Sequence, residues 1–323
     1  MKRGTTPFIF VNLRKAMIEG IFIEGLIFSI MALGILISFR LLNLADLTCD
    51  GSVSTGAAVA AIMIVNGVAI PVAMLFAFLA GVLCGLCTAA IHNHLRIPGL
   101  LAGILTMTML YSINLRILGN KANLPLIKVD TLYKVWPKMM SFLSPEVASL
   151  VGTLILIIVL KIILDLFFHS DLGISLGAMG GNEQVVISLG MSPSTLKYVG
   201  IGLSNGLIAL SGALLAQYQG FADTSLGTGM VVQGLAAIML GEFIFNTNKI
   251  SLITLRVILG SIIYKGLMYF GRKYGHYVGI TPNDFKLLTG LLVIISLVIA
   301  STRQRASEEN ARKKALLRIK EEN

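Results

Sequence analysis

The stretch ADLTCDGSVSTGAAVAAIM, residues 45–63, sets two carboxylates directly before a run of small apolar residues. A second stretch, ADTSLGTGMVVQGLAAIML at residues 222–240, repeats this order: Ala-Asp, then Ser, Thr and Gly, then Ala-Ala-Ile-Met. Short, glycine-interrupted apolar segments in corresponding places are typical of duplicated membrane transporters, whose substrate sites lie between the repeats. The pattern therefore predicts two related halves, at about residues 20–118 and 196–301.

The composition predicts a membrane protein. Of the 323 residues, 55% are hydrophobic and 13% are charged, whereas a soluble domain carries about 25% charged residues. A helix crosses a bilayer with ~20 apolar residues. Candidate runs occur at residues 20–39, 53–66, 69–91, 97–118, 149–168, 198–216, 230–245, 250–270 and 285–301. The expected fold is all-α and polytopic, with about 8–10 transmembrane helices over residues 20–301. The shortest runs, 53–66 and 230–245, are expected to be broken or re-entrant.

Basic residues predict the orientation. The net charge is +10, and Lys and Arg cluster before the first apolar run and after the last. Such clusters mark the cytoplasmic side, so residues 1–19 and the basic tail 302–323 are both expected inside. Alternation then places the loop 119–147 outside and the loop 169–195 inside. Nucleic-acid binding is set aside, because the basic residues flank apolar runs and form no patch on a soluble fold.

The inner loop contains GGNEQVVISLGM, residues 180–191. Asn182 is a strong helix N-cap, Glu183 suits the first turn, and Gly190 suits the position after the last turn. The sequence therefore predicts a short capped helix with exposed aliphatic side chains, which usually indicates a partner. A helix lying on lipid is the alternative, although such helices are rich in Lys, Arg and aromatic residues.

Two longer stretches carry a family resemblance: FRLLNLADLTCDGSVSTGAAVAA at 39–61, and 176–242, which begins LGAMGGNEQ and ends GLAAIMLGE. They resemble permease subunits of bacterial ABC importers of the branched-chain amino-acid and ribose permease family, in a branch similar to aromatic amino-acid (tryptophan/tyrosine) importers. In that family a Gly-x-Asn loop forms the coupling helix that docks on the ATPase. The resemblance implies ATPase-coupling residues Gly180, Gly181, Asn182, Glu183, Gln184, Leu189 and Gly190. One departure is Gly177, where the family usually has an arginine.

The chain has no G-x-x-x-x-G-K-[ST] motif, so no P-loop for ATP is present. No group of His, Cys and carboxylates has metal-ligand spacing, and no catalytic set stands out. We therefore expect a transporter subunit with no directly bound cofactor or metal, and ATP and Mg²⁺ on a partner ATPase. The resemblance further implies an extracytoplasmic substrate-binding protein, a second permease subunit as a homodimer, and the bacterial inner membrane.

The resemblance favours an amino acid as substrate, aromatic ahead of branched-chain, with a sugar or nucleoside as the alternative. An ion-coupled secondary transporter is the alternative function, because it would also explain the repeat and the polar residues inside apolar runs. It would not explain the capped helix of the inner loop.

Polar side chains inside apolar runs predict the translocation pathway, because a charged group in the bilayer costs ~2.5–3.5 kcal/mol. Hydroxyls and amides suit a zwitterion that must also be released. The candidate pathway residues are Asn43, Asp46, Thr48, Asp50, Asn205, Gln217, Gln219 and Asp223. Asp50 is expected to cap its own helix at 53–66, with a place in the gate as the alternative. Gly81 and Gly85 are assigned to helix packing, and Arg256 is expected to snorkel.

Overall fold

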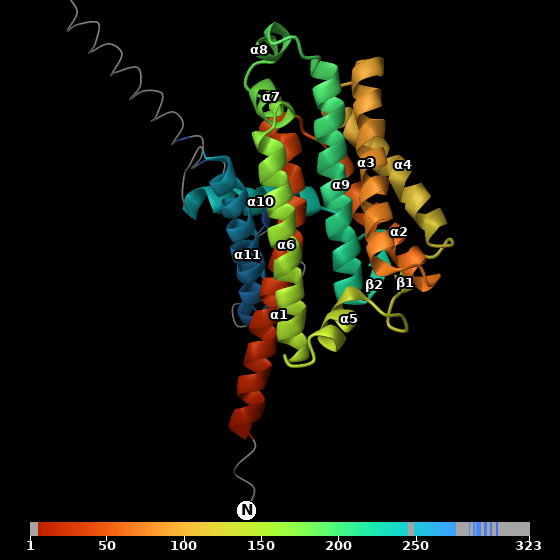
Figure 1. Cartoon of the computed structure of the whole chain (residues 1–323), viewed down its shortest axis with the longest axis vertical. Coiled ribbons are helices and arrows are strands. Elements are labelled where there is room, and N and C mark those ends of the chain that lie inside the picture. The colour runs from red at the N-terminus through yellow and green to blue at the C-terminus, as the bar shows by residue number, and fades with distance from the viewer. Residues whose placement is uncertain are drawn as a thin grey trace, which may run out of the picture. The chain divides into compact units, whose positions relative to one another are not determined.

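The computed structural model describes residues 6–244 and 249–275, with side chains from residue 18 onward, and isolated helical residues between 284 and 302. The chain forms two compact units, Met1–Tyr269 and Phe270–Asn323. The second unit holds the end of the last long helix, and the elements below are otherwise those of the first. Figure 1 shows the helices α1 (Thr6–Ile35), η1 (Leu36–Leu41, π-helical), α2 (Thr48–Val65), α3 (Ile70–Leu95), α4 (Gly99–Ile117), α5 (Leu132–Met139), α6 (Pro145–His169), α7 (Asp171–Met179), α8 (Glu183–Ser188), α9 (Pro193–Gln219), α10 (Met230–Ile244) and α11 (Ile250–Tyr274), and the strands β1 (Asn123–Pro125) and β2 (Phe221–Asp223).

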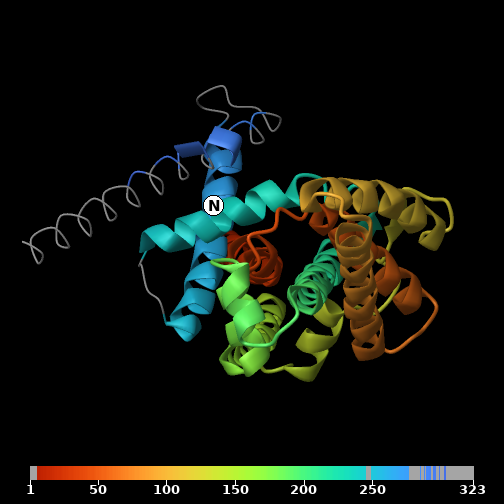
Figure 2. The ribbon, with the colours of Figure 1, turned by 90° about the horizontal axis from the view of Figure 1, so that it is seen from above.

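The polytopic all-α prediction is confirmed. Within the described residues, 7 helices are long and apolar enough to cross a membrane, and α10 is a shorter apolar helix. Seen from above, α10 lies across the bundle instead of running along it (Figure 2). The segment expected near 230–245 is therefore short, but it is one continuous helix. The other segment expected to be broken, 53–66, lies within α2, which is continuous and long enough to cross a membrane. The candidate run at 285–301 and the tail 302–323 lie largely outside the described residues.

The predicted start of the second span is wrong by five residues. The helix α2 begins at Thr48, not at residue 53, so the polar segment forms its first turns. A local contact stabilises this start, because the carboxylate of Asp46, which precedes the N-cap Leu47, accepts a hydrogen bond from the Thr48 N–H at 2.9 Å. Within the helix, the Thr55 hydroxyl donates to the Gly51 carbonyl at 2.9 Å. A hydroxyl bonded back to its own helix leaves no unpaired donor in the bilayer.

The helix α9 is the centre of the bundle, and α1, α2 and α3 pack around it. Glycines allow these helices to approach closely. A Cβ at Gly56 of α2 would lie 1.9 Å from the Ala209 carbonyl oxygen, and one at Gly81 of α3 would lie 2.3 Å from the Asn205 carbonyl oxygen. The predicted packing role of Gly81 and Gly85 is therefore confirmed, and small residues set the helix crossings.

The loop 119–147 folds back onto one end of the bundle. The strand β1 pairs antiparallel with β2, which follows α9. The ring of Trp136 lies against Gly152 of α6, and the Tyr133 ring makes edge contacts with Trp136 and Tyr218, at centroid distances of 5.2 and 5.0 Å. These aromatic residues therefore fix α5 against α6 and α9.

Two predictions about orientation exclude each other in this structure. Midway along α1, Gly20 lies next to the hydroxyl of Tyr218, close to β2. At the end of η1, which follows α1, the Leu41 carbonyl lies against Gly180, which follows α7. The start of α1 and the α7–α8 segment thus lie at opposite ends of the bundle (Figure 1). Both were expected on the cytoplasmic side, and this arrangement allows only one of them to lie there.

Candidate functional site

Three polar residues of the predicted pathway region form a buried network around α9. The Asn205 side-chain amide donates to Asp46 Oδ2 at 2.7 Å and accepts from the Ser52 hydroxyl at 2.6 Å. All three side chains are fully buried. Burial raises the pKa of the Asp46 carboxyl, and hydrogen bonds from Thr48 and Asn205 partly oppose that shift. The network ties the loop 42–47 and α2 to α9, and none of its members reaches the surface of this chain.

Asp50 lies within α2 and holds the start of another helix. Its Oδ2 accepts from the Gly229 N–H at 2.8 Å, and its Oδ1 accepts from the Val231 N–H at 2.9 Å. These donors belong to the first turn of α10, where a carboxylate is favourable. The predicted cap at 53–66 is therefore wrong, because Asp50 lies inside α2 and caps α10. Ser54 supports the same junction by accepting from the Gly227 N–H at 3.1 Å.

The remaining pathway candidates are dispersed. Thr48 and Thr88 share a buried hydrogen bond at 2.6 Å between their hydroxyls. Gln217 is buried and accepts from the Leu132 N–H at 3.1 Å, whereas Gln219 is exposed at the end of α9. Asp223 accepts from the Ser225 N–H at 2.7 Å, two residues ahead. This is the same local turn that Asp46 makes with Thr48, and it supports the proposed duplication.

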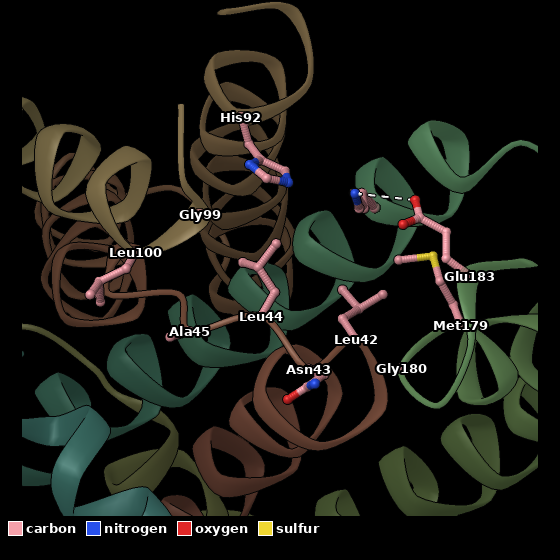
Figure 3. A pocket seen from close by; sticks show the side chains of 11 residues that line it. Leu42, Asn43, Leu44, Ala45, His92, Gly99, Leu100, Met179, Gly180 and Glu183 are labelled. Atoms are coloured by element: carbon pink, nitrogen blue, oxygen red, sulfur yellow. Dashed lines mark ion pairs between the residues drawn. The ribbon is translucent and has the colours of Figure 1, made fainter. Parts of the chain in front are cut away.

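Asn43 lines a cavity of about 330 Å³ at the α7–α8 end (Figure 3). The other lining residues are Leu42, Leu44, Ala45, His92, Gly99, Leu100, Met179, Gly180, Glu183 and Lys197. Glu183, labelled in Figure 3, forms an ion pair with Lys197 of α9, at 3.5 Å between Oε1 and Nζ. A Cβ on Gly180 would lie 2.2 Å from the Leu41 carbonyl oxygen. The inner loop therefore packs directly on the segment that leads to Asp46.

The predicted capped helix is confirmed in its local structure. The helix α8 spans Glu183–Ser188, and Asn182 Oδ1 accepts from the Gln184 N–H at 2.9 Å. Gly190 has a left-handed φ of 78°, which closes the helix. Val186 points inward, a detail the sequence pattern missed. Three neighbouring aliphatic side chains stay exposed, with fractions of 44% for Val185, 51% for Ile187 and 65% for Leu189.

A second cavity, of about 350 Å³, lies between α2, α4 and the loop before α10. We call it the Asp50 cavity, and it is lined by Asp50, Gly51, Ser54, Met107, Thr108, Tyr111, Ser112, Asn114, Thr224 and Thr228. The sequence prediction missed its α4 side. The signal was present, because Thr108, Tyr111 and Ser112 stand at i, i+3 and i+4 in an apolar run and share one helix face.

Arg256 does not snorkel as predicted. Its side chain is 4% exposed, and its guanidinium binds Glu242 of α10 at 3.0 Å. Glu242 also pairs with Arg40, at the end of η1, at 3.5 Å. Glu242 reaches Arg256 because α10 lies across the bundle. The sequence of α11 alone does not predict this contact.

Comparisons with known proteins agree with this architecture. Residues 17–297 match the family described as branched-chain amino acid transport system / permease component. The tyrosine transport system permease protein of Clostridioides difficile (strain R20291) is 38% identical over 90% of this chain and 93% of its own length. The autoinducer 2 import system permease protein LsrC of Escherichia coli O9:H4 (strain HS) is 28% identical over 59% of this chain and 54% of its own.

A solved structure shares the fold. PsaBC from Streptococcus pneumoniae, in complex with Fab, aligns with a TM-score of 0.50 at 14% identity, over 88% of this chain and 90% of that chain. The match to the family model over residues 17–297 and the long apolar helices lead to one assignment. The chain belongs to the branched-chain amino acid transport permease family, and it is a multi-pass permease subunit of an ABC transporter.

Proposed function

We propose that this chain is the membrane subunit of an ATP-driven importer for an amino acid, aromatic ahead of branched-chain. The observation that carries the proposal is α8, a capped helix whose exposed aliphatic face lies at one end of the bundle. The similarity to the permease of a tyrosine transport system supports the substrate class.

The α8 helix is the proposed docking element for a separate ATPase subunit, which would bind ATP and Mg²⁺. Val185, Ile187 and Leu189 form the exposed face, and an exposed apolar face favours a protein partner. Because Gly180 touches the Leu41 backbone, a displacement of α8 reaches the loop 42–47 and its buried Asp46. This contact is the proposed route by which ATPase closure changes access to the pathway.

The Asp50 cavity is the proposed place of the translocation pathway. Thr108, Tyr111 and Ser112 are exposed on the outer face of α4. Polar groups facing lipid are unfavourable, so such a face belongs against a wet cavity or a partner. We propose that a second copy of the chain completes the pathway there, and that an extracytoplasmic binding protein delivers substrate at the end formed by β1, β2 and α5.

The proposed location is the bacterial inner membrane, with α7 and α8 in the cytoplasm. The start of α1 then lies outside, since α1 crosses the bundle once between Gly20 and Leu41. Arg40, Arg96 and Lys197 lie at the α8 end, consistent with a cytoplasmic surface.

The test is purification of the chain after co-expression with the genes beside its own. The expected result is a complex with an ATPase subunit, which Ile187→Asp disrupts because a charge enters the docking face. The matched control, Ile127→Asp, alters an exposed aliphatic residue of the loop 119–147 and should leave the complex intact. Purification without an ATPase, or uptake that needs only an ion gradient, would instead favour a secondary transporter.

A further inference from the structure

The Asp50 cavity contains a hydrogen-bond acceptor that lacks a donor. Asn114 is 1% exposed, and its side-chain oxygen has no hydrogen-bond partner among the described residues. Its side-chain nitrogen donates to the Gly51 carbonyl at 3.4 Å. A buried acceptor without a donor is unfavourable, because it has lost its hydrogen bonds to water. A group that donates hydrogen bonds inside the cavity would remove this cost.

The rest of the lining favours a cation. Asp50 supplies a carboxylate, and no Lys, Arg or His is among the described lining residues. Each Asp50 oxygen accepts one backbone N–H, and a carboxylate offers about four acceptor positions in total. Further acceptor positions therefore remain for a bound group. The hydroxyls of Thr224 and Thr228 add acceptors on the opposite wall.

We infer that the Asp50 cavity is a subsite for the ammonium group of an amino acid in transit. An ammonium has three donors and no acceptor, which matches Asp50 together with the unpaired oxygen of Asn114. Met107 and Tyr111 flank the same cavity and provide apolar contact for the substrate side chain. The volume of about 350 Å³ lies within the range of small-molecule sites. The inference rests on the proposed function, since it assigns a substrate group to the proposed pathway.

The subsite also contacts the start of α10. Because the Asp50 carboxylate caps α10, an ammonium bound there shares its acceptor with the start of that helix. At its other end α10 carries Glu242, which pairs with Arg40 and Arg256. Substrate binding is thereby linked to the helix that lies across the bundle.

The test uses the full-length permease in lipid nanodiscs, with Cys87→Ser to remove the exposed cysteine, since Cys49 and Cys84 are buried. Thr108→Cys then places one thiol in the cavity wall for a membrane-impermeant maleimide. The probes are L-tyrosine, tyramine, and 3-(4-hydroxyphenyl)propionate, which lacks the ammonium. L-tyrosine and tyramine should slow labelling, and the propionate should not. Equal protection by all three probes, or protection by none, overturns the inference.

Two variants test the acceptors in this background. A charge-assisted hydrogen bond contributes about 1.5–3 kcal/mol, so its loss should raise the protecting concentration of tyramine about tenfold or more. Asp50→Asn removes the charge while keeping one side-chain oxygen for α10, and Asn114→Leu removes the unpaired oxygen. The control Asp130→Asn alters an exposed carboxylate paired with Lys138 and should leave protection unchanged. Unchanged protection in Asn114→Leu overturns the inference even where Asp50→Asn fails to fold.

The proposed function is tested separately. Loss of the ATPase from the purified complex would refute the importer while leaving ammonium-dependent protection in place. Conversely, an intact ATP-driven complex without such protection would refute only the subsite.

Discussion

The Oδ1 atom of Asp50 lies 2.9 Å from the backbone nitrogen of Val231, so a carboxylate of α2 caps the short helix α10. Removing this cap should destabilise the fold. We expect Asp50→Ala to lower the free energy of unfolding by about 1–2 kcal/mol, because first-turn N–H groups of α10 lose their acceptor. Asp50→Asn should retain most of that stability, since Asn also caps.

The measurement is the thermal unfolding midpoint in detergent. Asp130→Ala is the control, because Asp130 is exposed and should shift the midpoint little. A midpoint that is equal for Asp50→Ala and the parent would show that the contact does not stabilise α10.

Gly56 should not tolerate a methyl group. A Cβ there would lie 1.9 Å from the Ala209 carbonyl oxygen of α9, so Gly56→Ala must separate α2 from α9. Overpacking of this kind costs about 1–3 kcal/mol. Gly177→Ala is the matched control, because a Cβ at Gly177 meets nothing within 4 Å and alanine is the better helix former. Comparing the two thermal midpoints checks the prediction, and a Gly56→Ala protein as stable as Gly177→Ala would contradict it.

The Arg256–Glu242 pair should show strong coupling. The guanidinium is nearly buried, and removing one partner of such a pair leaves an uncompensated charge, at a cost of about 3 kcal/mol. Glu242→Gln and Arg256→Met should each destabilise, and the double variant should recover part of the loss. A double-mutant cycle measures this coupling. Arg40→Met should cost under about 1 kcal/mol, because the Arg40 side chain is 65% exposed. Strictly additive effects of the two single variants would exclude the coupling.

The start of α1 should face the same side as the loop 119–147. Single cysteines at Ile18, Ile127 and Leu189, which are all exposed, can be labelled with an impermeant thiol reagent in vesicles of known orientation. With Cys87 replaced by serine, Ile18→Cys and Ile127→Cys should react from the outside. Leu189→Cys should react only from the cytoplasmic side. Reaction of Ile18→Cys and Leu189→Cys from the same side would contradict the single crossing of α1.

The local structure followed from the sequence where neighbouring residues decide it. The α8 helix is bounded by Asn182 and Gly190 as predicted, because caps depend on backbone groups two or three residues away. The long apolar runs became the long helices, because the bilayer requires each backbone group to be paired within its own segment. The packing role of Gly81 also followed, since small residues at helical spacing have few other uses in a membrane.

The site depended on contacts that no local pattern contains. Asp50 looked like the cap of its own helix, yet its acceptors serve α10, about 180 residues further along the chain. Asn205 looked suited to a wet pathway, but Asp46 and Ser52 occupy its amide. The sequence prediction did not include the α4 face, because Thr108 and Tyr111 line a cavity only when α2 and the loop 224–228 pack beside α4.

By itself, the sequence determined a polytopic permease with a capped inner helix, because hydrophobicity and capping act over short distances along the chain. Only the tertiary structure decided which polar groups pair with each other and which remain available. The physical reason is that a carboxylate or amide in an apolar bundle takes whichever donor the packing brings to it, and that packing depends on helices far apart in the sequence.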